Sequence, residues 1–153
     1  MSTVDGVPER LTTKPSWLIT QLAVHARRLV SQAEAELAAR TYHYRILATL
    51  QEFGPSSQAD LARRGTMDRS DVVAAINELA EQGHVERTPD PDDRRRNIVS
   101  LTRTGTQHLR RLDRALDKVQ TDLLHPLTAE ERQTLTALLT RVLVHHQPAS
   151  SQD

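Results

Sequence analysis

The residues with the clearest chemical purpose lie between positions 90 and 102, in the segment DPDDRRRNIVSLT. Three successive arginines, Arg94, Arg95 and Arg96, follow a run of prolines and aspartates. A guanidinium group forms forked hydrogen bonds with phosphates and base edges, and a narrow A·T-rich minor groove attracts inserted arginine. The segment therefore predicts DNA contacts by these arginines. The alternative is that Arg94 only pairs with Asp90 or Asp92 and stiffens a hairpin.

A second polar group stands at the start of a predicted helix, residues 68–82. Arg69 has the geometry to bond guanine bidentately, and Ser70 can bond a base or a phosphate. Ser70 and Asp71 equally suit a helix cap. Arg63 and Arg64 fit a phosphate clamp or a solvated helix face. The predicted DNA-binding residues are Ser57, Arg63, Arg64, Arg69, Ser70, Asp71, Asn77, Arg94, Arg95 and Arg96.

The spacing of apolar residues and turn formers predicts the elements that must position these side chains. Helical spacing predicts helices at about 15–37, 42–53, 58–64, 68–82, from 105 to Pro126, and after a capping box at Thr128. The third helix, a tight turn and the fourth helix have helix-turn-helix dimensions. Alternation predicts strands at 84–87 and 97–101, which make the arginine segment a hairpin tip.

We therefore expect a mainly α fold with a small β-wing, in which a winged helix-turn-helix is joined to dimerisation helices from both chain ends. The predicted DNA-binding lobe is 42–102, and the predicted dimerisation region is 15–41 with 103–146. Residues 1–14 are expected to be a flexible leader and 147–153 a frayed tail.

Composition narrows the function classes. The 153 residues have a formal net charge of zero and no cysteine, which excludes disulfides, thiolate catalysis and cysteine-ligated zinc. No acid pair, phosphate loop or nucleophile–base arrangement has a meaningful spacing, so we expect no enzyme. The polar N-terminus and the lack of a long apolar run predict a cytoplasmic protein without a membrane partner. All basic residues except Lys14 and Lys118 are arginine, so binding would depend on their placement rather than on bulk charge.

The order of motifs along the chain resembles the MarR family of bacterial regulators over about residues 17–145. The matching residues are Tyr44-Arg-Ile-Leu47, Gln58-Ala-Asp-Leu-Ala62, Asp68-Arg-Ser70, Leu79 to Gly83, Val85-Glu-Arg87, Asp90 to Arg94 and Leu101 to Gly105. The DPDDRR…LTxxG run is the specific signal, because each shorter piece alone would be weak.

The sequence departs from the family pattern at three places. Gly65-Thr66 stands where the family more often has Leu-Gly, which bears on the turn. Val73 and Ala74 occupy recognition-helix positions that are often Ser/Thr and Arg, which bears on base readout. His43 stands where Gln is common, which bears on ligand chemistry.

The resemblance implies a homodimer whose subunits interlock through helices from both chain ends. Two recognition helices would then read a pseudo-palindromic operator in double-stranded DNA, with half-sites about 10 base pairs apart. A ligand-responsive repressor is the expected function, because most members of the family repress transcription rather than activate it.

A small-molecule effector is also implied by the resemblance, and no cofactor is required. Members often respond to phenolic or other anionic ligands between the dimerisation helices and the DNA-binding lobe. An arginine and a histidine beside an apolar wall suit a small aromatic acid. The alternative is that these are ordinary surface or interface side chains. The candidate ligand-binding residues are Trp17, His25, Arg28, His43 and Arg45.

Two further interpretations stay open at this point. His25, His43 and His108 could converge with a carboxylate on zinc, which would make the protein a metal-responsive regulator of the same fold. No tight spacing motif supports that site. The protein could instead be a helical interaction adaptor without DNA binding, although the arginine-rich wing argues against it.

Overall fold

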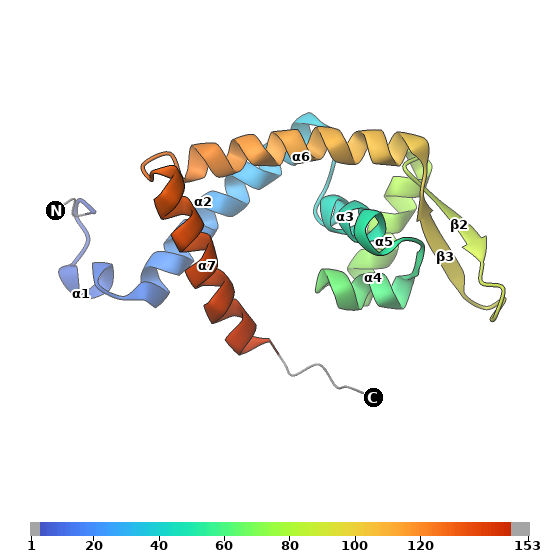
Figure 1. Cartoon of the computed structure of the whole chain (residues 1–153), viewed down its shortest axis with the longest axis horizontal. Coiled ribbons are helices and arrows are strands. Elements are labelled where there is room, and N and C mark those ends of the chain that lie inside the picture. The colour runs from blue at the N-terminus through green and yellow to red at the C-terminus, as the bar shows by residue number, and fades with distance from the viewer. Residues whose placement is uncertain (1–3, 148–153) are drawn as a thin grey trace. The chain divides into compact units, whose positions relative to one another are not determined.

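The computed structural model describes residues 4–147, which form a mostly helical chain with one small antiparallel sheet (Figure 1). The elements are α1 (Glu9–Thr12), α2 (Pro15–Glu36), α3 (His43–Phe53), β1 (Ser56–Ser57), α4 (Gln58–Gly65), α5 (Arg69–Glu81), β2 (Val85–Pro89), β3 (Asn97–Leu101), α6 (Arg103–Leu123) and α7 (Ala129–His146). The predicted fold class is confirmed. The described residues fall into two compact units that divide after Val119.

The chain ends need separate mention. The one-turn helix α1 lies within the segment expected to be a flexible leader. Apart from Gln147, which is the C-cap of α7, the expected frayed tail lies outside the described residues. Within residues 4–147, none of the helices combines the length and apolar character needed to span a membrane.

The core of the predicted DNA-binding lobe lies among α3, α4, α5 and the sheet. Leu61 of α4 and three residues of α5, Val72, Ile76 and Leu79, are fully buried where the two helices of the helix-turn-helix pack together. Ile46 and Leu47 of α3 and Val99 of β3 close the same core. Burying a side chain of this size stabilises the fold by about 1.5–3 kcal/mol, so the core fixes how α4 and α5 are angled.

The three strands pair in the order β1-β3-β2, and both pairings are antiparallel. Strand β1, which the sequence did not predict, pairs Ser56 with Val99. Two serines carry no alternation, and their pairing partner lies more than forty positions away. Strand β2 also runs two residues beyond its predicted end, to Pro89, which pairs with Asn97. The sheet therefore ties the start of α4 to the wing.

Helix α6 begins two residues earlier than predicted because Thr102 caps it. The Thr102 hydroxyl accepts a hydrogen bond from the Gly105 N–H and donates one to the Gly83 carbonyl. A Cβ at Gly105 would stand 1.9 Å from the His84 carbonyl oxygen, so the helix start lies directly against the start of β2. The buried stripe of α6 then consists of Leu109, Leu112, Leu116 and Val119.

Helix α7 belongs to the second unit, and its predicted capping box is confirmed. The Thr128 hydroxyl accepts from the Glu131 N–H, and the Glu131 carboxylate accepts from the Thr128 N–H at 2.8 Å. Five of its large apolar side chains are exposed in this single chain: Leu138, Leu139, Val142, Leu143 and Val144.

Candidate DNA-binding surface

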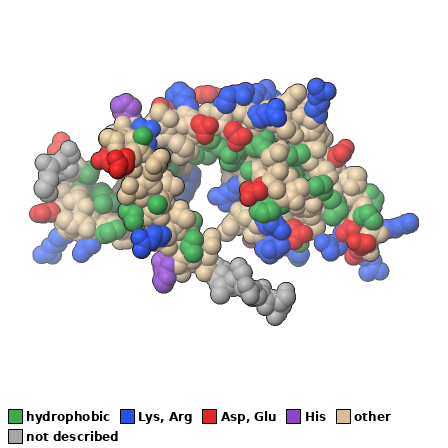
Figure 2. Space-filling model, viewed as in Figure 1, with side chains coloured by type: hydrophobic (Ala, Val, Ile, Leu, Met, Phe, Trp, Pro, Cys, Tyr) green, Lys and Arg blue, Asp and Glu red, His purple; other side chains and the backbone are tan. Residues whose placement is uncertain are grey.

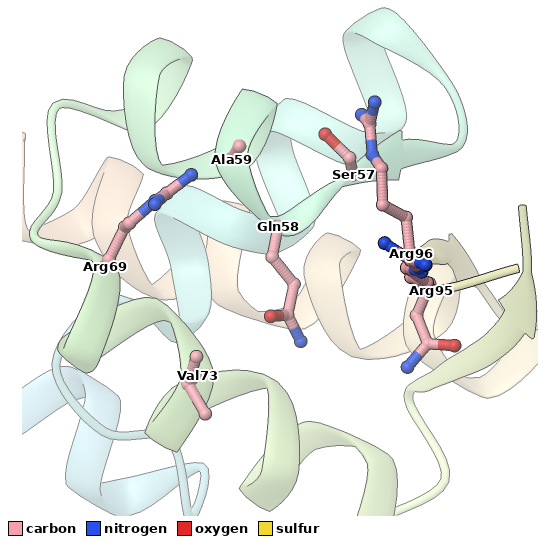
Figure 3. Close-up of a pocket in the computed structure, with 8 residues that line it drawn as sticks. Ser57, Gln58, Ala59, Arg69, Val73, Arg95 and Arg96 are labelled. Carbon is pink, nitrogen blue, oxygen red and sulfur yellow. The ribbon is translucent and has the colours of Figure 1, made fainter. Parts of the chain in front are cut away.

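A groove of about 600 Å³ opens on the lobe between the start of α4, the start of α5 and the wing (Figure 3). It brings together side chains from three separate chain segments. The lining residues are Ser57, Gln58, Ala59, Arg69, Val73, Arg95, Arg96 and Asn97. The sequence predicted four of these as DNA contacts and did not predict Gln58, Ala59, Val73 and Asn97 in this role.

The three predicted DNA contacts at the start of α5, Arg69, Ser70 and Asp71, differ in their surroundings. Asp68 is the N-cap, and its Oδ1 accepts hydrogen bonds from the Ser70 N–H and from the Ser70 hydroxyl. Arg69 is exposed and lines the groove. Asp71 lies away from the groove, in a hollow that it shares with Arg40 and Glu78. Of this group, Arg69 is therefore placed to meet a molecule in the groove, whereas Ser70 is engaged in the cap.

The wing loop is ordered by its own aspartates. The Asp90 N–H donates to the Arg96 carbonyl, and the Asp93 Oδ1 accepts from the Arg95 N–H. The ion pair considered for Arg94 is formed by Arg96 instead, whose Nε lies 4.0 Å from Asp90 Oδ2. Among residues 4–147, neither Arg94 nor Arg95 forms an ion pair with a carboxylate, and all three arginines are exposed. Figure 2 shows basic side chains gathered at this end of the lobe.

The arginines of α4 have partners within the lobe. Arg63 Nη2 lies 3.0 Å from Asp60 Oδ1, and this bond, followed by one from Ser57, lowers the pKa of the Asp60 carboxyl. The Arg64 guanidinium lies 4.1 Å from the centre of the Phe53 ring. Ser57 is buried and caps α4 by accepting from the Asp60 N–H.

Asn77 lies on α5 outside this groove lining, and its Oδ1 accepts a hydrogen bond from Arg87 of β2. The contact joins the recognition helix to the first strand of the wing. Asn77 is exposed, so its predicted contact with DNA would require the amide to bond both partners or to exchange one for the other.

The C-terminal half of α5 is held by the junction between α2 and α3. Glu78 bonds Arg40 Nη1 at 3.1 Å through one carboxylate oxygen and His43 Nε2 at 2.8 Å through the other. His43 Nδ1 accepts from the Arg40 N–H, so the neutral ring carries its proton on Nε2 and donates to Glu78. Burial lowers the pKa of His43, and the bond to Glu78 opposes that shift.

The predicted ligand-binding residues do not all face one space. Trp17, His25 and Arg28 lie on α2, where Trp17 is half-buried and the other two are exposed. Arg45 of α3 is exposed, with its guanidinium 5.4 Å from the centre of the Tyr42 ring. His43 is buried in the lobe and bonded to Glu78, so its side chain is not available to an effector in this conformation.

The zinc hypothesis is not supported. Residues 4–147 contain no group of three or more side chains that could hold a metal, so His25, His43 and His108 do not form the predicted ligand set. His25 is exposed on α2, whereas His43 and His108 are buried in the lobe and on α6.

His108 stacks on His84, with ring centres 4.2 Å apart and planes 4° apart. Its Nδ1 accepts from Arg111, which leaves a buried Nε2–H without a partner, and His84 Nδ1 is likewise unpartnered. Burial, and then the neighbouring His84, lower the pKa of His108 to about 4. Burial also lowers the pKa of His84, with Arg111 and His43 acting in the same direction. The pair is therefore a neutral stacked contact between the wing and α6.

Comparison with known proteins agrees with this geometry. A family model described as the MarR family matches residues 37–96, which include the helix-turn-helix and most of the wing. The transcriptional repressor NicR of Pseudomonas putida is 25% identical over 140 residues, which are 92% of this chain and 89% of NicR. A Thauera aromatica protein named for regulation of the hcr operon is 38% identical over 86 residues. That alignment covers 56% of this chain and about half, 52%, of the Thauera protein.

Among solved structures, the chain is similar to the regulator PcaV of Streptomyces coelicolor in complex with its natural ligand. The TM-score is 0.72 and the identity 25%, over 96% of this chain and 100% of PcaV. The winged helix, the motif order and these relatives together show that the chain is similar to the MarR family of transcriptional regulators over its helix-turn-helix and most of its wing.

Proposed function

We propose that the protein is a sequence-specific repressor that binds double-stranded DNA as a homodimer and releases it in response to a small ligand. The observation that carries the proposal is the groove in which Arg69 of α5 and Arg95 and Arg96 of the wing meet. On this proposal the protein catalyses no reaction of its own.

The groove suits the two faces of a DNA duplex. The start of α5 enters the major groove, where Arg69 bonds a guanine through its O6 and N7 atoms. The wing tip follows the backbone into the neighbouring minor groove, because Arg94 and Arg95 have no carboxylate in ion-pairing distance among the described residues. The backbone N–H groups at the start of α4 favour a phosphate at the rim of the groove.

The dimer is proposed from apolar surface that this single chain leaves open. Helix α2 exposes Leu18, Ile19, Leu22 and Val24, and helix α7 exposes a longer set of its own. Exposed apolar side chains in such runs mark an interaction surface. A closed two-fold dimer would cover them and set two α5 helices about one turn of DNA apart.

The effector is proposed to be a small aromatic acid. PcaV, a relative, was solved with its natural ligand. In this chain Arg28 and Arg45 supply cationic groups for a carboxylate, and Trp17 supplies an apolar wall for a ring. His25 lies on the same helix as Trp17 and Arg28.

Salt-dependent binding to the DNA upstream of the protein's own gene tests the proposal. Wild type is expected to form a specific complex whose log affinity falls linearly with log salt concentration. Arg94→Ala with Arg95→Ala should weaken binding and reduce the slope by about 1–2, because each lost phosphate contact contributes about 0.9. Arg110→Ala with Arg114→Ala is the matched control, since it removes the same charge from exposed sites on α6 outside the groove.

An unchanged slope in the wing variant would refute the wing contact. The absence of any specific complex at low salt would refute the repressor itself and favour an interaction adaptor.

A further inference from the structure

Val73 is an exposed apolar side chain on α5, a helix whose other large apolar side chains are buried. The buried stripe of α5 consists of Val72, Ile76 and Leu79, and Val73 lies beside that stripe with 42% of its surface exposed. A β-branched residue is also no better than average for helix stability. Neither core packing nor helix propensity therefore explains a valine at this position.

Few large apolar side chains of the lobe are exposed in this way. Within residues 42–102, all of which the structure describes, the exposed large hydrophobics are Phe53 and Val73. The Arg64 guanidinium covers the Phe53 ring. Val73 has no comparable cover and faces the groove directly.

Val73 and Arg69 are one helical turn apart and line the same groove (Figure 3). Four residues of α-helix advance about 6 Å, and stacked base pairs are about 3.4 Å apart. Two side chains one turn apart on a helix in the major groove therefore reach base pairs one or two steps apart.

The chemistry of the isopropyl group selects its partner. It cannot donate or accept a hydrogen bond, so it cannot read the polar pattern of a base edge. Thymine is the one standard base that presents an apolar group, its C5-methyl, in the major groove. We propose that Val73 is a specificity-determining residue that recognises the C5-methyl group of a thymine, one or two base steps from the guanine bonded by Arg69. This inference rests on the proposed function and adds the base that the groove selects.

Thymine-to-uracil substitution tests the contact, because it removes the methyl group and leaves every hydrogen-bonding atom in place. Uracil is introduced at each thymine of both half-sites of the bound operator in turn, and affinity is measured by fluorescence anisotropy. Wild type should lose about fourfold in affinity per half-site at one symmetric thymine position, as expected for one buried methyl group. Uracil outside the half-sites is the control and should change nothing.

The Val73→Ala variant completes the cycle. It should bind the thymine operator about fourfold to tenfold more weakly, and it should distinguish thymine from uracil at the critical position less than wild type does, because alanine retains only one methyl group for the contact. Its thermal unfolding should match that of wild type because Val73 contributes little to the core.

The outcomes separate the two levels of the proposal. If wild type binds specifically but tolerates uracil at every thymine, or if Val73→Ala keeps the same sensitivity, the thymine contact is refuted and the repressor stands. If wild type forms no specific complex, the proposed function and the thymine contact are refuted together.

Discussion

Acid should destabilise the DNA-binding lobe through the stacked pair His84–His108. The pKa of His108 is lowered to about 4 in the folded protein, against about 6.5 for an unfolded histidine. Above pH 6.5 both states are neutral, so the pair has no pH dependence there. Below pH 6.5 His108 is protonated in the unfolded chain but stays neutral in the folded protein, so the free energy of unfolding falls as the pH is lowered to about 4.

The shift sets the size of the effect. His108 alone should lower the free energy of unfolding by about 1.5 kcal/mol at pH 5.5 and about 2.5 kcal/mol at pH 4.5. The lowered pKa of His84 adds a loss of the same sign. Arg111 and His43 are the neighbouring groups whose positive charge opposes protonation of the pair. A domain of this size is stabilised by about 5–15 kcal/mol, so the loss is a substantial fraction.

Urea denaturation followed by circular dichroism, at one fixed protein concentration and several pH values from 8 to 4.5, measures the effect. His108→Leu removes the titrating group and the unpartnered Nε2 of that residue, so it should be near wild type at pH 8 and progressively more stable than wild type below pH 6.5. His25→Gln is the control, because His25 is exposed on α2. If the difference between His108→Leu and wild type stays constant over the whole range, the reasoning is wrong.

Three further substitutions test the scaffold of the groove. Gly105→Ala would bring a Cβ within 1.9 Å of the His84 carbonyl oxygen. We expect thermal unfolding to show a loss of about 3 kcal/mol or more in the free energy of unfolding. Gln107→Ala, at an exposed site on the same helix, is the control and should show no loss. Asp68→Ala removes the N-cap of α5 and should lower the free energy of unfolding by about 1 kcal/mol. Asp68→Asn should keep most of the capping stabilisation, so equal losses in the two variants would contradict the capping role. Tyr44→Phe removes the 2.9 Å hydrogen bond from the Tyr44 hydroxyl to Asp113. Burial, and then this bond, raise the pKa of Tyr44 to about 12. The variant should lose about 1 kcal/mol of unfolding free energy, and an unchanged unfolding midpoint would show that the bond contributes nothing.

Local signals in the sequence predicted local structure well. Asp68 and Gly83 bracket α5, and Thr128 with Glu131 starts α7, because caps and left-handed turn residues act within one turn of the backbone. Strand β3 has its predicted bounds because Asn97 to Leu101 alternate cleanly. Strand β1 was missed because its two serines are strand only through their pairing with β3.

The candidate site was predicted as separate charged groups, and the structure adds the surface that unites them. Arg69 and the wing arginines were found from residue type and position alone. Gln58 joins them only because β1 ties the start of α4 to β3, which no short window of sequence contains. A signal for Val73 was present, because it falls beside the Val72–Ile76–Leu79 stripe and would be exposed on any helix that buries that stripe.

The prediction that His108 is a metal ligand was wrong. Its residue type suggested a metal ligand, but it lies four residues before Leu112 and therefore on the same buried face of α6. A histidine on such a face meets whatever packs there, and here that is His84 at the start of β2. The stack could not be inferred from spacing because the two rings come from different elements.

The two halves of α5 serve different purposes, and this division explains how a chain with zero net charge can direct arginine at a duplex. The C-terminal half is fixed, since Glu78 bonds Arg40 and His43, and Gln82 donates to the Ala38 carbonyl. The N-terminal half presents Arg69 and Val73 to the groove, and the Asp68 side chain at its start accepts a hydrogen bond from the Ser70 N–H. The acidic side chains near the groove fix the helix and order the wing loop, and Asp90 pairs with Arg96. Among the described residues, Arg69, Arg94 and Arg95 form no ion pair with a carboxylate. The groove lining therefore carries three arginines and no acidic side chain, which favours a negatively charged partner although the net charge of the chain is zero.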